Sequence, residues 1–136
     1  MENNMSESIQ HYELVQKLLS EIKKEIPEDK WILIQTDSFC SKSIPPKFGD
    51  GSRPDVYYEF ENIMIVGEAK ISKDVTSERS QRQYRSFLYS CSIYTGKAML
   101  FLAVPFDEYV IASNAINKIK KEFEGSYEVR IVRCNI

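Results

Sequence analysis

The chain has 136 residues, a length that predicts a single domain over residues 1–136. Apolar residues make up 43% of it and charged residues 28%, an ordinary globular composition that argues against a disordered or fibrous chain. The formal net charge of −2 disfavours a protein that coats nucleic acid through general basicity, so any nucleic-acid contact must use a local basic patch.

The cysteines and the N-terminus indicate the cellular compartment. Cys40, Cys91 and Cys134 are far apart and odd in number, which favours reduced thiols over a zinc site or a disulfide scaffold. The N-terminal segment MENNMSESIQ is polar and acidic, unlike a signal peptide, and no apolar run reaches the roughly 18 residues that span a bilayer. We therefore expect a cytoplasmic protein, or a nuclear one if its host has a nucleus, without a membrane partner.

The first third of the chain predicts a helix, a strand and a long loop. Residues 6–26 are expected to form an amphipathic helix, with Ser6 as its N-cap and Pro27 at its end. Its apolar positions recur every three or four residues: Ile9, Tyr12, Val15, Leu18, Leu19, Ile22 and Ile26. KWILIQTDSF (30–39) has the β-branched and aromatic content of a strand. Residues 40–54 contain three Pro and two Gly and are expected to form an exposed, functional loop.

The remainder of the chain predicts alternating strands and helices. DVYYEF (55–60) and IMIVGEAKI (63–71) are strands joined by the short turn Glu61-Asn62, so they are expected to form a hairpin. The elements that follow are a helix over 76–93, a buried strand over 97–106, a helix over 107–124 that stops at Gly125, and a strand over 127–136. The order α-β-β-β-α-β-α-β predicts an α/β fold with a mixed central sheet flanked by helices.

Three charged residues are expected to meet at one end of the hairpin. Side chains alternate across a strand, so Glu68 and Lys70 point to the same face at the end of the most apolar strand. Asp55 opens the preceding strand, and the short turn places that start beside the end of the next strand. Two carboxylates and one ammonium group therefore converge at the sheet edge.

Such a pair of carboxylates favours a bound cation. Two adjacent carboxylates repel each other, and one of them takes up a proton unless a cation holds both in the ionised form. Carboxylate oxygens select hard ions, so we expect Mg²⁺ or Mn²⁺, which polarises a phosphoryl oxygen and activates water. Lys70 is then placed to orient the water or to offset charge in the transition state.

Pro54-Asp55 followed by Glu68-Ala69-Lys70 resembles the PD-(D/E)XK signature of the restriction-endonuclease-like nucleases. Their core has the order α-β-β-β-α-β, which the first five-sixths of this chain is expected to reproduce, with one helix and one strand added at the C-terminus. The resemblance implies that Asp55 and Glu68 are metal ligands, that the Ala69 backbone carbonyl is a third metal contact, and that Lys70 is catalytic. It also implies phosphodiester hydrolysis that leaves a 5′-phosphate and a 3′-hydroxyl.

The resemblance extends to the two helices of the core. Many members carry an acidic residue on the first helix, and Glu13 lies at the edge of the stripe that includes Ile9 and Tyr12, which makes Glu13 the candidate third acid. On the second helix, Gln81 lies one turn before Tyr84, on the face expected to point inward. Gln81 is therefore a candidate to hydrogen-bond a phosphate or a water on the metal.

Basic residues occur in the long loop and on the second helix, on both sides of the expected site. They predict a phosphate-binding rim made of Lys42, Lys47, Arg53, Lys73, Arg79, Arg82 and Arg85. A solvated helix face explains the three arginines at least as well.

Simpler interpretations stay open for the same residues. Asp55 follows a proline, where aspartate is a common turn residue. Glu68 and Lys70 also fit a salt pair at a strand end, which contributes little when exposed. His11, the only histidine, points away from Glu13 on a helix and is interpreted as a surface or packing residue, although some viral RNA endonucleases of this superfamily use a first-helix histidine.

The sequence therefore predicts a Mg²⁺- or Mn²⁺-dependent endonuclease that acts on DNA. Little accessory structure is left for sequence recognition, so we expect a structured target, such as a junction, flap or end, or one delivered by a partner. Junction-cleaving members work as dimers, which makes a homodimer an expectation here. The alternatives are an RNA endonuclease, a non-catalytic nucleic-acid- or protein-binding module that keeps the fold, and an α/β structural protein with an accidental motif.

Overall fold

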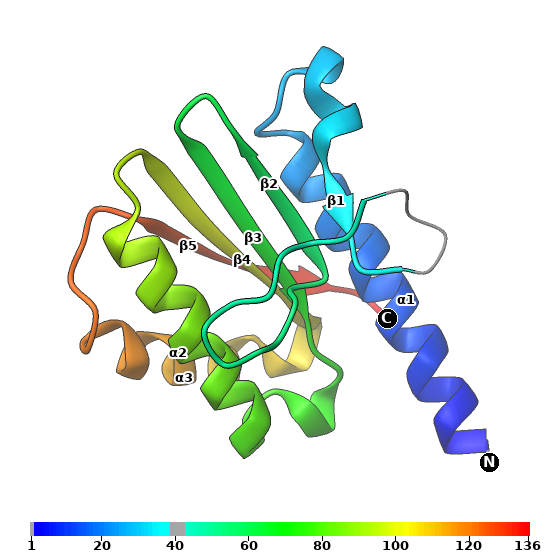
Figure 1. Ribbon diagram of the computed structural model, residues 1–136. Coiled ribbons are helices and arrows are strands. Elements are labelled where there is room, and N and C mark those ends of the chain that lie inside the picture. Colours follow the sequence, from blue (N-terminus) through cyan, green and yellow to red (C-terminus); the bar gives the residue numbers. More distant parts are fainter. Residues whose placement is uncertain (1, 39–42) are drawn as a thin grey trace.

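The computed structural model describes residues 2–38 and 43–136. A five-stranded mixed sheet runs through the centre, with helices on both faces (Figure 1). The order of strands in the sheet follows the chain: β1 (Gln35–Thr36), β2 (Val56–Phe60), β3 (Ile63–Ala69), β4 (Lys97–Pro105) and β5 (Glu128–Cys134). β1, β2 and β3 pair antiparallel, whereas β3, β4 and β5 pair parallel. The expected α/β class with a mixed sheet flanked by helices is confirmed.

Three α-helices cover the sheet: α1 (Glu2–Lys23) on one face, and α2 (Glu78–Ile93) and α3 (Tyr109–Lys120) on the other (Figure 1). α2 connects β3 to β4 and α3 connects β4 to β5, as parallel neighbours require a crossover connection. Short 3₁₀ helices lie at Glu28–Leu33, Ser72–Asp74 and Phe106–Glu108. None of the helices within the described residues has the length and apolar content needed to cross a bilayer.

The β2–β3 hairpin follows the expected register. Glu61 and Asn62 both have positive φ, 49° and 62°, as the two-residue type I′ turn demands. Phe60 pairs with Ile63, and the ladder continues to the pair of Val56 with Gly67. The residue before Val56 is therefore carried next to the residue after Gly67.

β3 has apolar side chains on both faces, which is why its sequence is nearly continuously apolar. Met64 and Val66 pack in the core under α2 and α3, while Ile65 packs in the core under α1. A side chain at Gly67 would place its Cβ 2.6 Å from Cδ1 of Ile22 and 3.2 Å from Cβ of Val56, so glycine here favours the close approach of α1 to the sheet. The close approach of α1 helps to position its N-terminal half over the end of the hairpin.

The expected inner face of α1 is wrong in part. Leu14, Leu18 and Ile22 are fully buried against the sheet, whereas Ile9 and Tyr12 are 56% and 64% exposed. The helix carries two overlapping apolar stripes, and periodicity alone does not choose between them. Its ends also differ from the prediction. It begins at Glu2, so the expected N-cap Ser6 lies inside the helix, and it ends at Lys23 before Pro27.

The strand expected over residues 30–39 is also wrong over most of its length. Residues Glu28–Leu33 form a 3₁₀ helix, and only Gln35–Thr36 pair with β2. The Trp31 indole explains the difference, because its Nε1 donates to the carbonyl oxygens of Ile26 at 2.9 Å and Lys23 at 3.2 Å. These bonds hold the segment against the end of α1. Phe39 and Cys40 lie outside the described residues.

The last predicted helix is shorter than expected. The segment 107–124 divides into the 3₁₀ helix Phe106–Glu108 and α3, which ends at Lys120 rather than at Gly125. The second helix and the last two strands agree with their predicted ranges to within a few residues.

Candidate active site

The hairpin brings Asp55 and Glu68 together at the end of the sheet. The backbone amide of Asp55 donates to Oε1 of Glu68 at 3.1 Å, and the amide of Ala69 donates to Oδ2 of Asp55 at 2.8 Å. Each carboxylate is thus oriented by the backbone of the opposite strand. The pairing is what the turn and the side-chain alternation predicted, and the chemical roles of the two acids stay a prediction.

Lys70 joins the two acids from the residue after β3. Its Nζ lies 3.1 Å from Oε2 of Glu68 and also donates to Oε1 of Gln83 on α2. Lys70 and Glu68 are only 9% and 5% exposed. A buried ion pair costs desolvation free energy and adds little net stability, so its presence here points to a role other than stability. The expected convergence of Asp55, Glu68 and Lys70 is present.

The surroundings of Glu68 favour its protonated form. The pKa of Glu68 is raised to about 8, chiefly by burial and next by the negative charge of Asp55, while Lys70 offsets part of both effects. Glu68 also contributes to the raised pKa of Tyr84, for which burial is the larger cause. A cation between the carboxylates would relieve this excess of buried negative charge.

His11 completes the site from α1. Its Nε2 lies 3.3 Å from Oδ2 of Asp55, the same oxygen that accepts the Ala69 amide. The side chain of His11 is 45% exposed and that of Asp55 16%, so this side of the site is open whereas the Lys70 side is closed. The hydrogen bond to Asp55 raises the pKa of His11 above its usual value, with burial acting in the opposite direction.

His11 is partly at the surface, as the sequence suggested, but its contact with Asp55 was not expected. The sequence contains the signal for its position, since Leu14, Leu18 and Ile22 follow at three- and four-residue steps. Choosing that stripe instead of the one through Ile9 would have placed His11 on the inner face. Glu13, the expected third acid, is two residues from His11, about 200° around the helix, and is exposed to solvent.

Gln81 is not the inward-facing glutamine of α2. Its Nε2 donates to the carbonyl of Thr76 at 2.9 Å, at the exposed start of the helix. Gln83 is buried instead and accepts the hydrogen bond from Lys70. The predicted stripe residues Tyr84, Phe87, Leu88 and Cys91 are all buried, but the buried position one turn before Phe87 is Gln83 rather than Gln81.

The carboxylates at this end of the sheet can bind a hard divalent cation, but they do not form a complete set of metal ligands. Among the described residues, no three His, Cys, Asp or Glu side chains form a group arranged to hold a metal. Mg²⁺ keeps several waters and is often bound through only one or two carboxylates, which Asp55 and Glu68 provide. The residues present therefore fit a Mg²⁺ or Mn²⁺ ion that water helps to coordinate.

Two hollows open on either side of His11. One, of about 250 Å³, is bordered by His11, Asp37 and Asp55 between α1 and the start of β2. The other, of about 410 Å³, is bordered by Glu7, His11 and Asp74 between α1 and the segment after β3. The first hollow gives a ligand access to the exposed side of Asp55, and both are bordered by His11.

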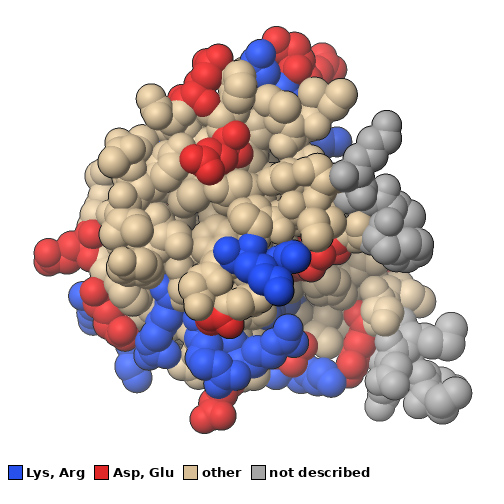
Figure 2. All heavy atoms as spheres, in the orientation of Figure 1, with Lys and Arg blue, Asp and Glu red and all other residues tan. Residues whose placement is uncertain are grey.

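The predicted basic rim divides into paired and unpaired residues. Lys73 lies 3.0 Å from Glu7, and Arg85 lies 3.4 Å from Glu122, so nearby carboxylates partly neutralise both. Within the described part of the chain, the rim residues without an ion pair are Lys47, Arg53, Arg79 and Arg82. Figure 2 shows basic side chains gathered over the loop before β2 and the start of α2. Lys42 lies outside the described residues.

Comparisons with known proteins identified no relative of this chain. No protein-family model matches the chain, no curated protein matches it, and no solved structure matches its fold. The nuclease hypothesis therefore depends on the motif residues and on how the fold arranges them.

Proposed function

We propose that the protein is a metal-dependent endonuclease of the restriction-endonuclease-like fold, which hydrolyses phosphodiester bonds in DNA. The observation that carries the proposal is the meeting of Asp55, Glu68 and Lys70 at one end of the β2–β3 hairpin, with Lys70 and Glu68 buried. An accidental motif in a structural protein has no reason to bring Glu68 into contact with both Lys70 and the backbone of Asp55.

Asp55, Glu68 and the Ala69 backbone carbonyl would hold the metal ion. When bound, Mg²⁺ or Mn²⁺ polarises a phosphoryl oxygen and increases the nucleophilicity of water. The backbone amides of Asp55 and Ala69 already donate to the two carboxylates, so the ligand oxygens are oriented before the ion arrives.

Lys70 would act on the reacting phosphate. Its ammonium group is held by Glu68 and Gln83 in a site from which water is largely excluded, where an electrostatic contact is stronger than in bulk water. An ammonium group fixed in this way stabilises the negative charge that develops on the phosphoryl oxygens and can orient the attacking water. Gln83 is a positioning residue in this proposal, in place of Gln81.

His11 would act at the open side of the site. It contacts Asp55 directly, and its raised pKa increases the fraction that is protonated near neutral pH. A protonated imidazole there attracts the phosphate and keeps Asp55 oriented toward the metal.

RNA is the second candidate substrate, favoured by one specific observation. His11 on the first helix contacts the motif aspartate, and RNA endonucleases that use a first-helix histidine belong to the superfamily that this chain resembles. Hydrolysis of RNA would use Asp55, Glu68 and Lys70 in the same roles.

The form of the target and the assembly are part of the proposal. With a net charge of −2 and few unpaired basic residues in the rim, the protein is suited to a limited number of phosphate contacts. A DNA junction, flap or end, or a target delivered by a partner, meets that condition. We also propose a cytoplasmic location and a homodimer.

A cleavage panel tests the proposal. Labelled linear, nicked, flapped and four-way DNA and single-stranded RNA are incubated with Mn²⁺, Mg²⁺ or EDTA, using wild type, Asp55→Ala and Lys70→Ala. Matched controls are Asp29→Ala, which is exposed, and Lys97→Ala, which lies at the opposite end of β4 from the site.

We expect metal-dependent cutting that the two site variants lose and the two controls keep. If no substrate is cut, calorimetric titration with Mn²⁺ distinguishes a metal site that requires a partner from a non-catalytic binding module. Mn²⁺ binding without cutting of any substrate would favour a site that requires a partner, and absence of both binding and cutting would leave only the non-catalytic binding module.

A further inference from the structure

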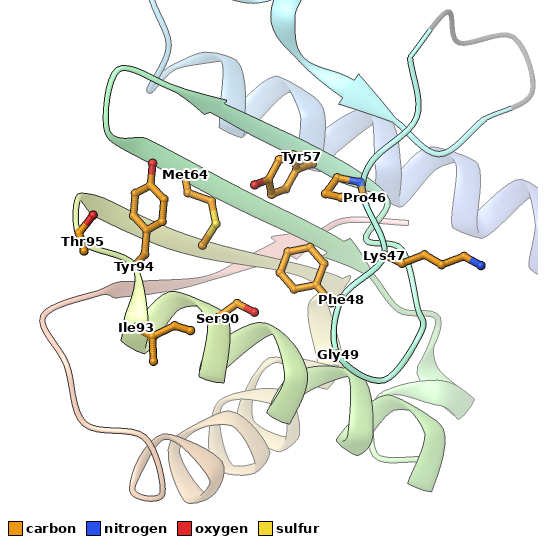
Figure 3. A pocket seen from close by; sticks show the side chains of 10 residues that line it. All are labelled: Pro46, Lys47, Phe48, Gly49, Tyr57, Met64, Ser90, Ile93, Tyr94 and Thr95. Atoms are coloured by element: carbon orange, nitrogen blue, oxygen red, sulfur yellow. The ribbon is translucent and has the colours of Figure 1, made fainter.

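A third hollow lies on the face of the sheet that α2 covers, between the loop before β2, the C-terminal part of α2 and the β2–β3 hairpin (Figure 3). Its volume is about 480 Å³, within the usual range for small-ligand sites. The lining is rich in aromatic and apolar side chains: Phe48, Tyr57, Met64, Ile93 and Tyr94. We call this hollow the base pocket, for the reasons that follow.

The aromatic wall at Phe48 is held in place by its neighbours. The Phe48 ring packs edge-to-face on Tyr57, with centroids 5.9 Å apart, and on Phe87, with centroids 5.1 Å apart. The loop is tied to α2 by the amide of Asp50, which donates to Oγ of Ser86 at 3.3 Å. The pocket is therefore preformed on this side, which lowers the entropy that a ligand must lose on binding.

Two aromatic rings flank the same space. In Figure 3, Phe48 and Tyr94 lie on opposite sides of the Met64 side chain, next to the hollow. Aromatic faces and a thioether are suited to a flat ring system. A planar heterocycle is therefore the shape that this lining accommodates best.

A carboxylate next to the lining residues Tyr57 and Tyr94 favours a ring that carries N–H donors. The Tyr57 hydroxyl donates to Oε1 of Glu59 at 2.6 Å, and Glu59 adds to the raised pKa of Tyr94, for which burial is the larger cause. The negative charge of Glu59 repels a phosphate but accepts a hydrogen bond from a ring amino group. A nucleobase combines such N–H donors with an aromatic face.

One wall of the base pocket, Tyr57, lies close in the chain to the proposed metal site. Tyr57 is two residues after Asp55, which immediately precedes β2, so the backbones of the two residues are roughly 7 Å apart. Lys47 also lines the pocket, and its side chain extends away from the hollow (Figure 3). A nucleotide with its base in the pocket would therefore have its phosphate near the site.

We propose that the base pocket binds an unpaired nucleobase of the strand that is cut. This inference rests on the proposed nuclease function, which it makes more specific. A base can enter only after it leaves its pair and its stack, which costs least at a single-stranded or flapped position. The preferred substrate is accordingly a strand with an unpaired base next to the cleaved phosphate.

Binding without cleavage tests this proposal. An oligonucleotide with the fluorescent base 2-aminopurine in a single-stranded overhang is titrated in EDTA with wild type, Phe48→Leu and Tyr94→Leu. The control is Tyr89→Leu. Tyr89 is an exposed aromatic residue of α2 that packs on Phe123, outside the pocket. Stacking of a base on one aromatic side chain contributes substantially to the binding free energy. We therefore expect the affinity of each pocket variant for the oligonucleotide to be at least about fivefold lower, and that of the control to equal wild type.

The variants are accepted only if their thermal unfolding matches that of wild type. Glu59→Gln serves as a second variant, which keeps both rings and is expected to change the preference among the four bases. Unchanged affinity in Phe48→Leu, Tyr94→Leu and Glu59→Gln would overturn the proposal, as would equal affinity for a blunt duplex. Displacement of the overhang by equimolar free mononucleotide would also overturn it, since the ligand would then be a free nucleotide.

The outcomes for the pocket and for the nuclease are separable. Cutting that depends on Asp55, with binding unaffected by the pocket variants, would overturn the base pocket and leave the nuclease. Base binding that depends on Phe48, with neither Mn²⁺ binding nor cutting of any substrate, would support the pocket and overturn the catalytic role.

Discussion

His11 Nε2 and Asp55 Oδ2 lie 3.3 Å apart, although the two residues are 44 positions apart in the chain. The same Asp55 oxygen accepts the backbone amide of Ala69 at 2.8 Å. A helix and a strand thus orient one carboxylate from two directions. This contact joins α1 to the end of the hairpin at the proposed metal site.

The pKa of His11 is expected to lie above 6.5, because its hydrogen bond to Asp55 favours the charged imidazole. His11 is the only histidine, so one set of imidazole NMR signals reports its titration. Asp55→Asn should return the pKa toward 6.5, and Mn²⁺, by competing for Asp55, should also lower it. An equal pKa in wild type and Asp55→Asn would disprove the contact in solution.

The same shift predicts the direction of a small pH effect on stability. A raised pKa in the folded state stabilises the protein fully below the unfolded pKa of about 6.5, and this contribution is lost as pH rises through the folded pKa. The side chain is nearly half exposed, so solvent screens the interaction and the effect should be small. Asp55→Asn should remove it.

Glu68→Gln is expected to stabilise the metal-free protein in alkaline solution. The pKa of Glu68 is about 8 in the folded state and 4.5 in the unfolded state, so the folded protein binds more protons between these values. The free energy of unfolding of wild type should therefore fall as pH rises from about 4.5 to about 8. Glutamine at this position removes that slope.

Urea unfolding at pH 5 and pH 9 measures the effect of Glu68→Gln, with the exposed Glu124→Gln as control. Saturating Mn²⁺ should stabilise wild type at pH 9 but not Glu68→Gln, because the ion binds the ionised carboxylate. A pH slope that is the same in Glu68→Gln and wild type would contradict the prediction.

Gln83→Leu should destabilise the protein and impair cutting. The substitution removes a buried acceptor of the Lys70 ammonium group, which costs about 1–3 kcal/mol when the donor stays buried. Gln81→Leu is the matched control, because Gln81 makes an exposed bond to Thr76 and should cost no more than about 1 kcal/mol. Urea unfolding and the cleavage assay give the two readouts, and equal effects of the two substitutions would contradict the assigned role of Gln83.

Arg79→Ala and Arg82→Ala should weaken nucleic-acid binding through lost phosphate contacts. The slope of log K against log salt concentration is expected to decrease by about 1 for each contact removed. Arg85→Ala is the control, because Glu122 already pairs with the Arg85 guanidinium. Affinity is measured by fluorescence anisotropy between 50 and 200 mM salt, a range over which each phosphate contact changes affinity by roughly three- to fourfold. Equal slopes for Arg79→Ala, Arg82→Ala and Arg85→Ala would assign the arginines to a solvated helix face.

Local sequence was sufficient to predict the hairpin and the meeting of its charged residues. A two-residue turn at Glu61-Asn62 sets the register, and strict alternation along β3 places Glu68 and Lys70 on one face. Both rules act over a few residues and depend little on the rest of the protein. For the same reason, most helices and strands could be predicted to within a few residues, whereas most of the strand expected over residues 30–39 is absent from the structure.

The contacts that complete the site depend on packing between distant elements. α1 has two apolar stripes, and the buried one, with Leu14 and Leu18, was selected by the fit of the helix over Gly67. That choice turns His11 toward Asp55 and Glu13 toward solvent. On α2, contact with Lys70 selects Gln83 over Gln81.

Residues 55 to 70 alone therefore determine that two carboxylates and a lysine lie at the end of a hairpin, because turn geometry and side-chain alternation are local properties. The partners supplied by α1, α2 and the loop before β2 follow from how apolar surfaces fit together across the whole sheet. Periodicity describes which positions are apolar, whereas burial depends on the shape of the surface against which the helix packs.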